Sequence, residues 1–379
     1  MTVPNSVIVD AVRSPIGVKH GHLIGIRPDD LCAQVIRGLL DRNPALDAEL
    51  IEDVVVGCAF PEGPQGMLLG RSVVLLAGIP KEAGGKVVNR FCGSSMDAVH
   101  QLSTAIECGD IEVGIAAGVE DMFSVPMGGF APDFHPDLAA RDFYISMGET
   151  AENLANDVGI SREDQEAFAI RSHEKALSAT AEGRFSNELV PIDVYGETVV
   201  EHDEGPRAPD IDKIRSLKPS FVENGSVTAA TSSPISIGAS ALLITSRAFA
   251  ERLSLTPRAD IVARAVAGVD WTRMGRGPLP ATAKALAKAG LEMADIETIE
   301  LNEAFAAQSL YVIREGGWDM DRINLNGGAV ALGHPLGCSG ARILTTLINV
   351  MEQQDTHTGL ATMCIGTGQG ITTIIRRPG

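Results

Sequence analysis

The feature that most constrains this chain is an internal duplication. Residues 51–60 and 296–305 share a pattern in which Ile-Glu opens a short run and Ala-Phe closes it, and the two stretches lie 245 positions apart. Gly114-Ile115-Ala116 and Gly359-Leu360-Ala361 repeat this offset. Self-similarity held without a gap over about seventy residues indicates one structural unit used twice. The 379 residues are also enough for two packed units.

Each copy has the pattern of alternating strands and helices. In the first copy, Pro28-Asp29-Asp30 opens one helix, and a second helix with Met96, Val99, Leu102 and Ile106 on one side stops at Gly109. In the second copy, the counterparts run from Pro280 to Gly290 and along Ile343, Leu344, Leu347 and Met351. Non-alternating Val/Ile runs predict buried strands at 53–56, 111–117, 296–301 and 359–365. The pattern predicts an α/β protein with two similar halves and largely parallel sheets.

An insertion of roughly residues 120–245 separates the two copies. It holds Pro/Gly-rich turns from Pro126 to Pro136 and a charged run, Glu201-His202-Asp203-Glu204. One amphipathic helix is expected from Ser161 to Gly183, with Ser161 and Asp164 forming a capping box. An insertion over a duplicated core is well placed to act as a lid or a ligand platform.

Charge and cysteine spacing exclude several classes of function. A formal charge of −18 argues against nucleic acid or an anionic membrane surface as a partner, and no apolar run is long enough to span a membrane. The six cysteines form no C-x-x-C pair and no metal-ligand spacing with the eight histidines, so we expect no metal. Met1–Ser6 carries no targeting pattern, and Arg376–Gly379 is not a peroxisomal address. We therefore expect a cytoplasmic protein.

Positions where the two copies differ are the candidates for chemistry. At the offset of 245, Cys92 aligns with Gly337, Asn89 with His334, Val119 with Cys364, and Gly57 with Asn302. One copy thus supplies a cysteine, and the other supplies an asparagine, a histidine and a second cysteine. All four lie at or just beyond the ends of predicted strands or in the turns that follow, where open α/β sheets bind ligands.

Cys92 lies at a predicted strand-to-helix junction, where a helix dipole and free N–H groups favour a thiolate and lower the pKa of the thiol. Gly93 would permit a sharp bend there, as in a nucleophile elbow. His334 lies in a stiff, glycine-rich loop and is a natural base for a thiol. Each residue also has a purely structural interpretation: a small buried thiol for Cys92 and Cys364, and a packed loop histidine for His334.

The glycine run from Gly366 to Gly370 is no dinucleotide fingerprint, because the nine residues after it read as a strand and leave no room for the required helix. Backbone N–H groups freed by glycines suit an oxyanion site instead.

Four blocks together resemble the thiolase family over the whole chain. They are Val88-Asn89-Arg90-Phe91-Cys92, Asn302-Glu303-Ala304-Phe305, Gly327 to Gly340 around Gly-His-Pro, and Cys364-x-Gly366-x-Gly368. The resemblance implies a layered αβαβα core of two halves, residues 1–119 with 237–256 and residues 257–379, and a loop domain over 120–236. It also implies roles: Cys92 carries the acyl group, His334 activates it, and Cys364 exchanges the proton at the α-carbon. Asn302 (through a water) with His334 would form one oxyanion hole, and the N–H groups of Cys92 and Gly366 the other.

The resemblance extends to the ligand contacts. Met147 and Met274 match acyl-pocket positions, Ser233 matches a coenzyme A contact, and Arg207 approximates one that faces the nucleotide. Taken alone, the two methionines would be core residues and Arg207 a solvated charge. Thr231, Pro234, Ile237 and Thr367 depart from the family pattern. The first three flank Ser233, so the coenzyme A loop would be reshaped there.

The resemblance is to degradative 3-ketoacyl-CoA thiolases, because the stretch from Glu120 to Met147 is short. It implies thiolytic cleavage in fatty-acid β-oxidation, with coenzyme A as co-substrate and no tightly bound cofactor. It also implies a homodimer or a dimer of dimers, which a hydratase/dehydrogenase subunit could join. The alternatives are a biosynthetic acetoacetyl-CoA thiolase, a related condensing enzyme such as a ketoacyl or hydroxymethylglutaryl synthase, and a non-catalytic acyl-CoA-binding protein on the same fold.

Overall fold

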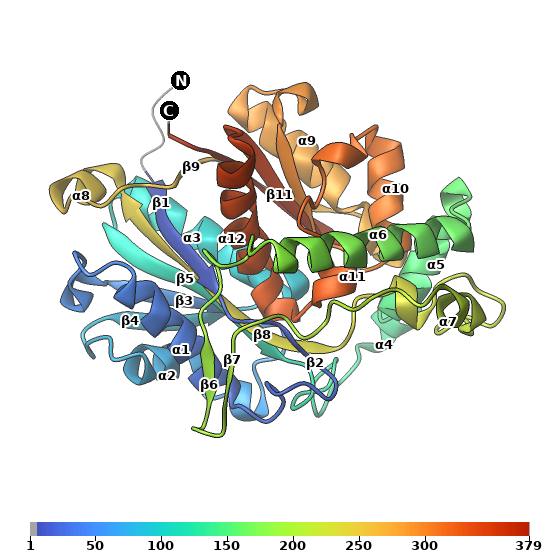
Figure 1. Cartoon of the computed structure of the whole chain (residues 1–379), viewed down its shortest axis with the longest axis horizontal. Coiled ribbons are helices and arrows are strands. Elements are labelled where there is room, and N and C mark those ends of the chain that lie inside the picture. The colour runs from blue at the N-terminus through green and yellow to red at the C-terminus, as the bar shows by residue number, and fades with distance from the viewer. Residues whose placement is uncertain (1–5, 379) are drawn as a thin grey trace.

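The computed structural model describes residues 6–378 (Figure 1). Met1–Asn5 and Gly379 lie outside the described residues. The expectation that the N-terminus carries no targeting segment rests largely on Met1–Asn5.

The first group of elements carries the sequence copy that contains Cys92. In chain order it comprises β1 (Ser6–Arg13), β2 (Gly17–Val18), α1 (Pro28–Asp41), β3 (Asp53–Gly57), α2 (Leu69–Leu76), β4 (Gly84–Val88), the 3₁₀ turn η3 (Phe91–Gly93), α3 (Ser94–Cys108), β5 (Val113–Asp121), β8 (Ser236–Ser246) and α8 (Arg247–Arg252).

The second group repeats this arrangement with differences. It comprises β9 (Ala259–Gly268), the 3₁₀ turn η5 (Trp271–Arg276), α9 (Pro278–Ala289), β10 (Thr298–Leu301), α10 (Ala306–Gly316), α11 (Ala329–Leu332), α12 (Leu336–Gln354), β11 (Thr358–Ile365) and β12 (Gln369–Arg376). Between the groups lie α4 (Pro136–Ala139), α5 (Met147–Val158), α6 (Arg162–Ala181), β6 (Ile192–Val194), β7 (Thr198–Val200) and α7 (Ile211–Ser216).

The large sheet is mixed and has the strand order β10-β11-β12-β9-β1-β8-β5-β3-β4, with β2 beside β8. Parallel pairing occurs where a helix returns the chain, in β3 with β4, β3 with β5, and β10 with β11. The strands of the middle pair antiparallel, so the expected parallel sheets are confined to the two βαβ regions. The β1–β9 ladder that joins the two groups is two residue pairs long, Val7 with Asp260 and Ile8 with Ala259.

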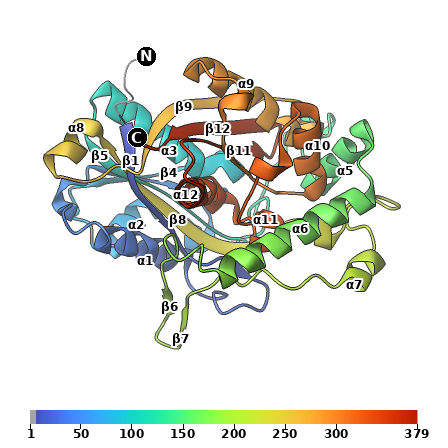
Figure 2. The same cartoon turned by 45° about the horizontal axis from the view of Figure 1, so that its top comes forward.

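Three buried cores define five layers. One core packs α1 and α2 on the outer face of the first group of strands, and another packs α9 and α10 on the outer face of the second. The third contains α3 and α12, which lie between the two groups of strands. Figure 2 shows α12 end-on in this central layer, between β8 on one side and β11 with β12 on the other. The layered αβαβα core is therefore confirmed.

The duplication is visible in the elements but is not perfect. At the offset of 245, β3 corresponds to β10, β5 to β11 and α3 to α12. The counterpart of β4 is instead the short helix α11, and α9 begins at Pro278, two residues before the expected Pro280. The helix expected from Ser161 is α6, and its capping box with Asp164 is present.

Candidate active site

Cys92 lies in η3, the turn that connects the end of β4 to the start of α3. The strained residue of this turn is Phe91, whose φ of 45° is left-handed and whose N–H donates to Asn89 Oδ1 at 2.9 Å. Gly93 has an ordinary φ of −86°, so the expectation that it makes the bend is wrong. A Cβ at Gly93 would lie 2.7 Å from the side chain of Ile365, so a close approach to β11 is what requires glycine there.

Cys364 and Gly366 come from the hairpin between β11 and β12. The backbone N–H groups of Gly366 and of Cys92 itself act to lower the pKa of the Cys92 thiol, so both lie near its sulfur. The turn η3 packs against β11, and a Cβ at Gly366 would lie 3.8 Å from the ring of Phe91. The pKa of the Cys364 thiol is raised by burial and, secondarily, by the charge of Cys92, so the two thiols are close enough to interact. Met147, the first residue of α5, lies beside the same turn, since a Cβ at Gly366 would be 3.3 Å from its sulfur. The structure thus brings together the nucleophile, the second cysteine, one oxyanion donor and one acyl-pocket methionine.

His334 and Asn302 form the other part of the site. Asn302 follows β10, and its Nδ2 lies 3.4 Å from His334 Nε2. The sequence placed His334 after a strand, but it follows α11 and precedes α12. The turn η3 packs against α12, the helix that begins two residues after His334.

The hydrogen bonds of His334 determine which ring nitrogen carries the proton. Ser339 Oγ lies 2.6 Å from His334 Nδ1 and donates to the Pro335 carbonyl at 2.9 Å. A hydroxyl has one proton to donate, so toward His334 it acts as the acceptor, and Nδ1 is protonated. Nε2 therefore accepts from Asn302 Nδ2 and is the ring nitrogen that can act as a base.

Burial governs the ionisation of these groups. It raises the pKa of the Cys92 thiol to about 11, although the N–H groups of Gly366 and Cys92 act in the opposite direction. The sequence-based expectation of a lowered pKa is therefore wrong, because desolvation outweighs the local N–H donors. Burial also lowers the pKa of His334 to about 3, with a smaller contribution from Arg342. Both groups are neutral near pH 7, so Cys92 needs a base at the moment of attack.

Two supporting residues were missed in the sequence. Ser339 is one, although its position 245 residues after Ser94, another serine at the start of a central helix, could have marked it. Glu120 is the other. Its buried carboxylate accepts from the N–H groups of Ala59 and Phe60 and from that of Gly337 in the first turn of α12, at 2.7 to 3.1 Å. It joins the two copies beside the site, and burial raises its pKa.

The remaining predicted ligand residues are spread around this centre. Ser233 is tied to the Asn302 loop, because its N–H and its hydroxyl both bond the Ala304 carbonyl at 3.0 Å. Met274 is buried in the outer core with α5 and α10. Arg207 is exposed and donates to the Gly205 carbonyl, and among the described residues it has no hydrogen bond to either active-site cysteine.

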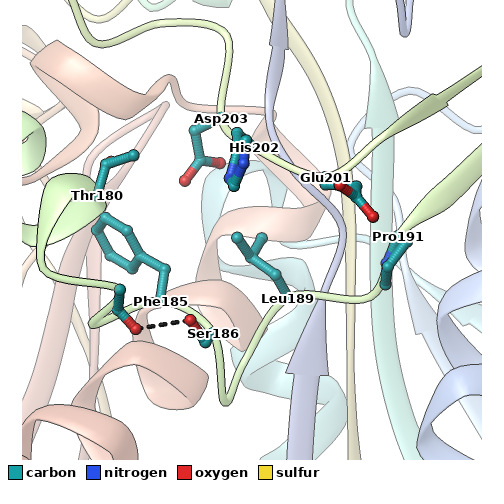
Figure 3. A pocket seen from close by; sticks show the side chains of 9 residues that line it. Thr180, Phe185, Ser186, Leu189, Pro191, Glu201, His202 and Asp203 are labelled. Carbon is teal, nitrogen blue, oxygen red and sulfur yellow. Dashed lines mark hydrogen bonds between the residues drawn. The ribbon is translucent and has the colours of Figure 1, made fainter.

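A cavity of about 210 Å³ lies elsewhere, between the end of α6 and the charged run (Figure 3). It is lined by Phe185, Leu189, His202 and Asp203 among others and by none of the site residues predicted above. Within residues 6–378, no group of three or more His, Cys, Asp or Glu side chains is arranged to hold a metal ion. None of the helices described is both long and apolar enough to cross a membrane.

Comparison with known proteins agrees with this architecture. The family models for the thiolase N-terminal domain and the thiolase C-terminal domain match residues 6–248 and 255–377. A 3-ketoacyl-CoA thiolase of Shewanella denitrificans is 52% identical over 384 residues, covering 98% of this chain and 99% of that protein, and one of Shewanella baltica is 53% identical with the same coverage. The crystal structure of the Bacillus anthracis acetyl-CoA acetyltransferase has a TM-score of 0.91 at 36% identity and covers 99% of both chains. The chain belongs to the thiolase family of acyltransferases.

Proposed function

We propose that this protein cleaves 3-ketoacyl-CoA with coenzyme A to give acetyl-CoA and a shortened acyl-CoA, the last step of fatty-acid β-oxidation. The observation that carries the proposal is the meeting of two cysteines from different copies. The turn that holds Cys92 packs against β11, which carries Cys364, and the Gly366 N–H and the Cys364 thiol both share the environment of the Cys92 thiol. The names of the Shewanella relatives support the same activity.

The chemistry divides among these residues. His334 Nε2 takes the thiol proton as Cys92 Sγ attacks C3 of the ketoacyl group. The bond between C2 and C3 then breaks, leaving the acyl group on Cys92 and the enolate of acetyl-CoA, which Cys364 protonates. In the second half, the Cys364 thiolate takes the proton of a coenzyme A thiol, which attacks the acyl-Cys92 thioester; the shortened acyl-CoA leaves, and Cys92 Sγ recovers its proton from His334.

Two groups of hydrogen-bond donors would stabilise the oxyanions of these steps. The N–H groups of Cys92 and Gly366 both act to lower the pKa of the Cys92 thiol, which supports their placement near a carbonyl bonded to its sulfur. Asn302, through a water, and His334 would form the second site, which suits the enolate oxygen.

The protein is proposed to use coenzyme A as a co-substrate, with no tightly bound cofactor. Residues 120–236 form a loop domain that carries acyl and coenzyme A contacts, over halves formed by residues 1–119 with 237–256 and by residues 257–379. The contact of Met147 with Gly366 and the bonds of Ser233 to Ala304 support this division. Met274 would line the acyl pocket, and Arg207 would meet the nucleotide phosphates. A cytoplasmic location remains part of the proposal.

The degradative direction is preferred over biosynthetic condensation. The relative that is named an acetyl-CoA acetyltransferase is 36% identical, against 52% and 53% for the 3-ketoacyl-CoA thiolases. Steady-state thiolysis over a ladder of acyl-chain lengths tests the direction. We expect kcat/KM to be higher for substrates of medium or long chain than for acetoacetyl-CoA, and the reverse order would contradict the degradative assignment.

The protein is proposed to form a homodimer through the exposed edge of β4. Larger assemblies would be a dimer of dimers or a complex with a hydratase/dehydrogenase subunit. β4 is the last strand of the sheet, and an edge strand can pair with a second copy. Met67 and Leu68, 95% and 56% exposed, precede α2, whose Gly70 lies against Lys86 of β4. We expect Met67→Asp to shift the sedimentation equilibrium toward monomer. Val199→Asp, at a distant exposed valine on β7, should leave it unchanged; dissociation by both or by neither would contradict this interface.

The roles of the two cysteines can be separated experimentally. Acyl transfer from a saturated acyl-CoA breaks only a thioester, so it needs Cys92 and His334 but no acid at carbon. Losing a positioned acid typically costs on the order of 10²–10⁴ in rate. We expect Cys364→Ser to lose thiolysis by that factor, yet to show an octanoyl adduct on Cys92 by mass spectrometry of the intact protein. Cys92→Ser should do neither. Near-normal thiolysis by Cys364→Ser would show that another group carries the proton.

A further inference from the structure

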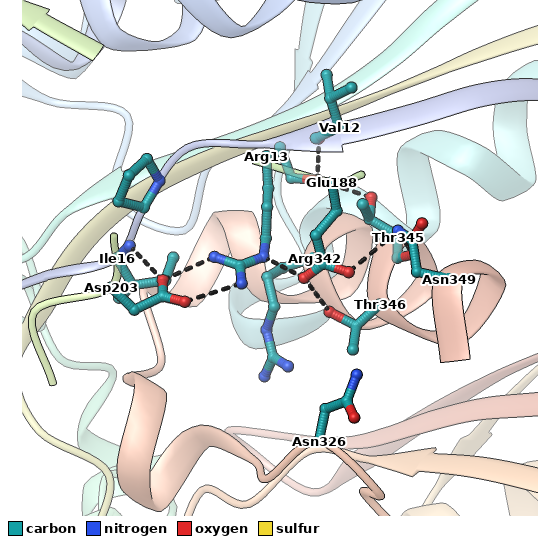
Figure 4. A network of polar contacts seen from close by, with 12 residues as sticks. Val12, Arg13, Ile16, Glu188, Asp203, Asn326, Arg342, Thr345, Thr346 and Asn349 are labelled. Atoms are coloured by element: carbon teal, nitrogen blue, oxygen red, sulfur yellow. Dashed lines mark hydrogen bonds and ion pairs between the residues drawn. The ribbon is translucent and has the colours of Figure 1, made fainter. Parts of the chain in front are cut away.

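Two fully buried arginines near the centre of the molecule differ in their hydrogen-bond partners. Arg13 at the end of β1 donates to Glu188 at 2.6 Å and to both oxygens of Asp203 at 2.7 and 2.9 Å. Arg342 on α12 is equally buried, yet none of its three guanidinium nitrogens has a hydrogen-bond partner within residues 6–378. In Figure 4 its guanidinium points away from the Arg13 network, toward Asn326.

The acidic group nearest to Arg342 is Glu300 on β10, whose pKa burial raises to about 8 although the charge of Arg342 acts in the opposite direction, so this carboxyl ionises fully only above that pH. Its Oε2 lies 3.9 Å from Arg342 Nη1, and both side chains are 1% exposed. That separation is too long for a direct hydrogen bond but within the span of one water that contacts both groups. Glu300 Oε1 also has no partner among the described residues. Because unsolvated buried ions are very costly, bridging water is the physical solution for such a pair.

The position of this pair in the fold connects it with the active site. Side chains alternate along a strand, so Glu300 and Asn302 lie on one face of the β10 segment, whereas Ile299 and Leu301 face the outer core. That shared face turns toward α12. Arg342 belongs to α12, the helix that begins two residues after His334. The pair therefore connects the strand that ends just before Asn302 with the helix that begins just after His334, and the side chains of Asn302 and His334 are 3.4 Å apart.

We propose that Arg342 and Glu300 form a water-bridged ion pair that fixes α12 against β10, and that both are positioning residues for the contact between His334 and Asn302. The role in catalysis rests on the proposed thiolase function. Asn302 Oδ1, itself buried without a partner in the described part of the chain, is a further acceptor for water bound in this space.

A double-mutant cycle with Arg342→Gln and Glu300→Gln tests the pair. At pH 9, above the raised pKa of Glu300, Glu300→Gln leaves a buried cation without its counterion, so we expect Tm to fall there by at least about 5 °C. The double variant replaces both charges with amides that can share the same waters, so its Tm should recover most of that loss. If the two losses of Tm simply add, no coupled pair exists and the proposal fails.

The proposed role in catalysis is tested by measuring kcat and the alkylation rate of Cys92 in the double variant. We expect kcat to stay roughly 10- to 100-fold below wild type with KM changed less than about twofold, because the residues position catalytic groups and do not touch substrate. The rate at which iodoacetamide alkylates Cys92 at pH 8 should also fall severalfold, since His334 would no longer be held as its base. Recovery of kcat and alkylation together with Tm would reduce the pair to a structural role. Arg342→Lys, which keeps the charge without the planar fork, should fold stably and show a smaller loss of kcat.

The exposed ion pair Arg252–Glu112 provides the control, because both of its side chains are about half exposed. Its two glutamine variants and their double should leave Tm, kcat and alkylation unchanged. The alkylation rate and Tm can be measured whether or not the protein catalyses thiolysis. An absence of thiolysis in the wild-type protein would overturn the proposed function. The alkylation rate and Tm would still decide whether the ion pair supports the Cys92–His334 site.

Discussion

At the scale of single residues, the site is built from groups that burial keeps uncharged. The pKa of Cys92 is raised to about 11 and that of His334 is lowered to about 3, in each case chiefly by burial. A thiol and an imidazole that are both neutral favour proton transfer during attack over a standing thiolate. Ser339 then becomes important, because it holds the proton on Nδ1 and leaves Nε2 free.

Removing the Ser339 hydroxyl should therefore impair catalysis without impairing binding. In Ser339→Ala, His334 loses the acceptor that fixes its tautomer, and loss of such an orienting partner typically costs 10–100-fold in activity. We expect kcat to fall by about that factor while KM changes little, measured by steady-state thiolysis. Ser178→Ala, on α6, serves as the control. An unchanged kcat, or a rise in KM alone, would mean that Ser339 does not orient the imidazole.

The sequence identified the reactive residues better than it identified their environment. Cys92, Cys364 and Gly366 were recognisable from local blocks and from their differences between the copies, and the structure brings them together. The pKa of Cys92 was predicted in the wrong direction because burial depends on β11 and α12, which are more than 240 residues away in sequence. Glu120 was missed for the same reason, since the groups it binds come from both copies.

At the scale of elements, α3 and α12 approach each other closely at their N-terminal turns. Ser95 on α3 and Gly340 on α12 are equivalent positions in the duplication. Ser95 Oγ donates to the Cys338 carbonyl at 3.0 Å and accepts from the N–H of Ala341 at 2.8 Å. A Cβ at Gly340 would lie 2.4 Å from the backbone nitrogen of Met96. The second copy needs glycine there because the first copy's backbone takes the space.

Gly340→Ala should consequently push α12, and His334 ahead of it, away from α3. Overpacking against backbone costs roughly 1–3 kcal/mol and sometimes more, so we expect unfolding free energy to fall by about 3 kcal/mol and thiolysis to fall with it. Urea denaturation and kcat measure the two effects. At Gly268, where a Cβ meets nothing within 4 Å, the same substitution should be nearly neutral. Equal effects at both glycines would contradict the steric explanation.

The main elements were predictable because each carries its own periodicity or capping signal, as in α1, α3, α6 and α12. The divergence of β4 and α11 was not, although they lie at equivalent positions of the duplication. β4 pairs with β3 at the edge of the sheet, whereas α11 packs against α6 of the inserted segment. The inserted segment occurs only once in the chain. Its contacts with α11 therefore explain why α11 and β4 differ although they are equivalent in the duplication.

At the scale of the whole molecule, the site depends on both copies at once. Cys92 comes from one copy, and Asn302, His334 and Cys364 come from the other. The β1–β9 ladder, which connects the strands of the two copies, is only two residue pairs long. The central layer of α3 and α12 provides most of the contact between the copies, with a core drawn from both groups of strands. Activity and global stability should therefore be lost together when this layer opens.

The same central burial makes a prediction about alkaline stability. Five buried thiols have pKa values that burial raises above 9.0, so from about pH 9 the unfolded chain loses these protons while the folded chain keeps them. The unfolded state then binds fewer protons, and the free energy of unfolding must fall as pH rises. Lys175, whose pKa burial lowers to about 8, opposes this with one proton. When the five thiols and Lys175 are taken together, the free energy of unfolding should fall by on the order of 4 kcal/mol between pH 9 and pH 10.

Urea denaturation at pH 8, 9 and 10 under reducing conditions measures this loss. Cys32 lies wholly inside the first core, so Cys32→Ala should lower stability at every pH but reduce the decline between pH 9 and 10 by about 1 kcal/mol. Cys108 is exposed, and Cys108→Ser should leave the decline unchanged. Comparing slopes separates ionisation from the cavity that the alanine creates, because a cavity costs the same at each pH. Stability that stays level to pH 10, or a decline that Cys108→Ser reduces as much as Cys32→Ala, would show that the buried thiols do not set the alkaline limit.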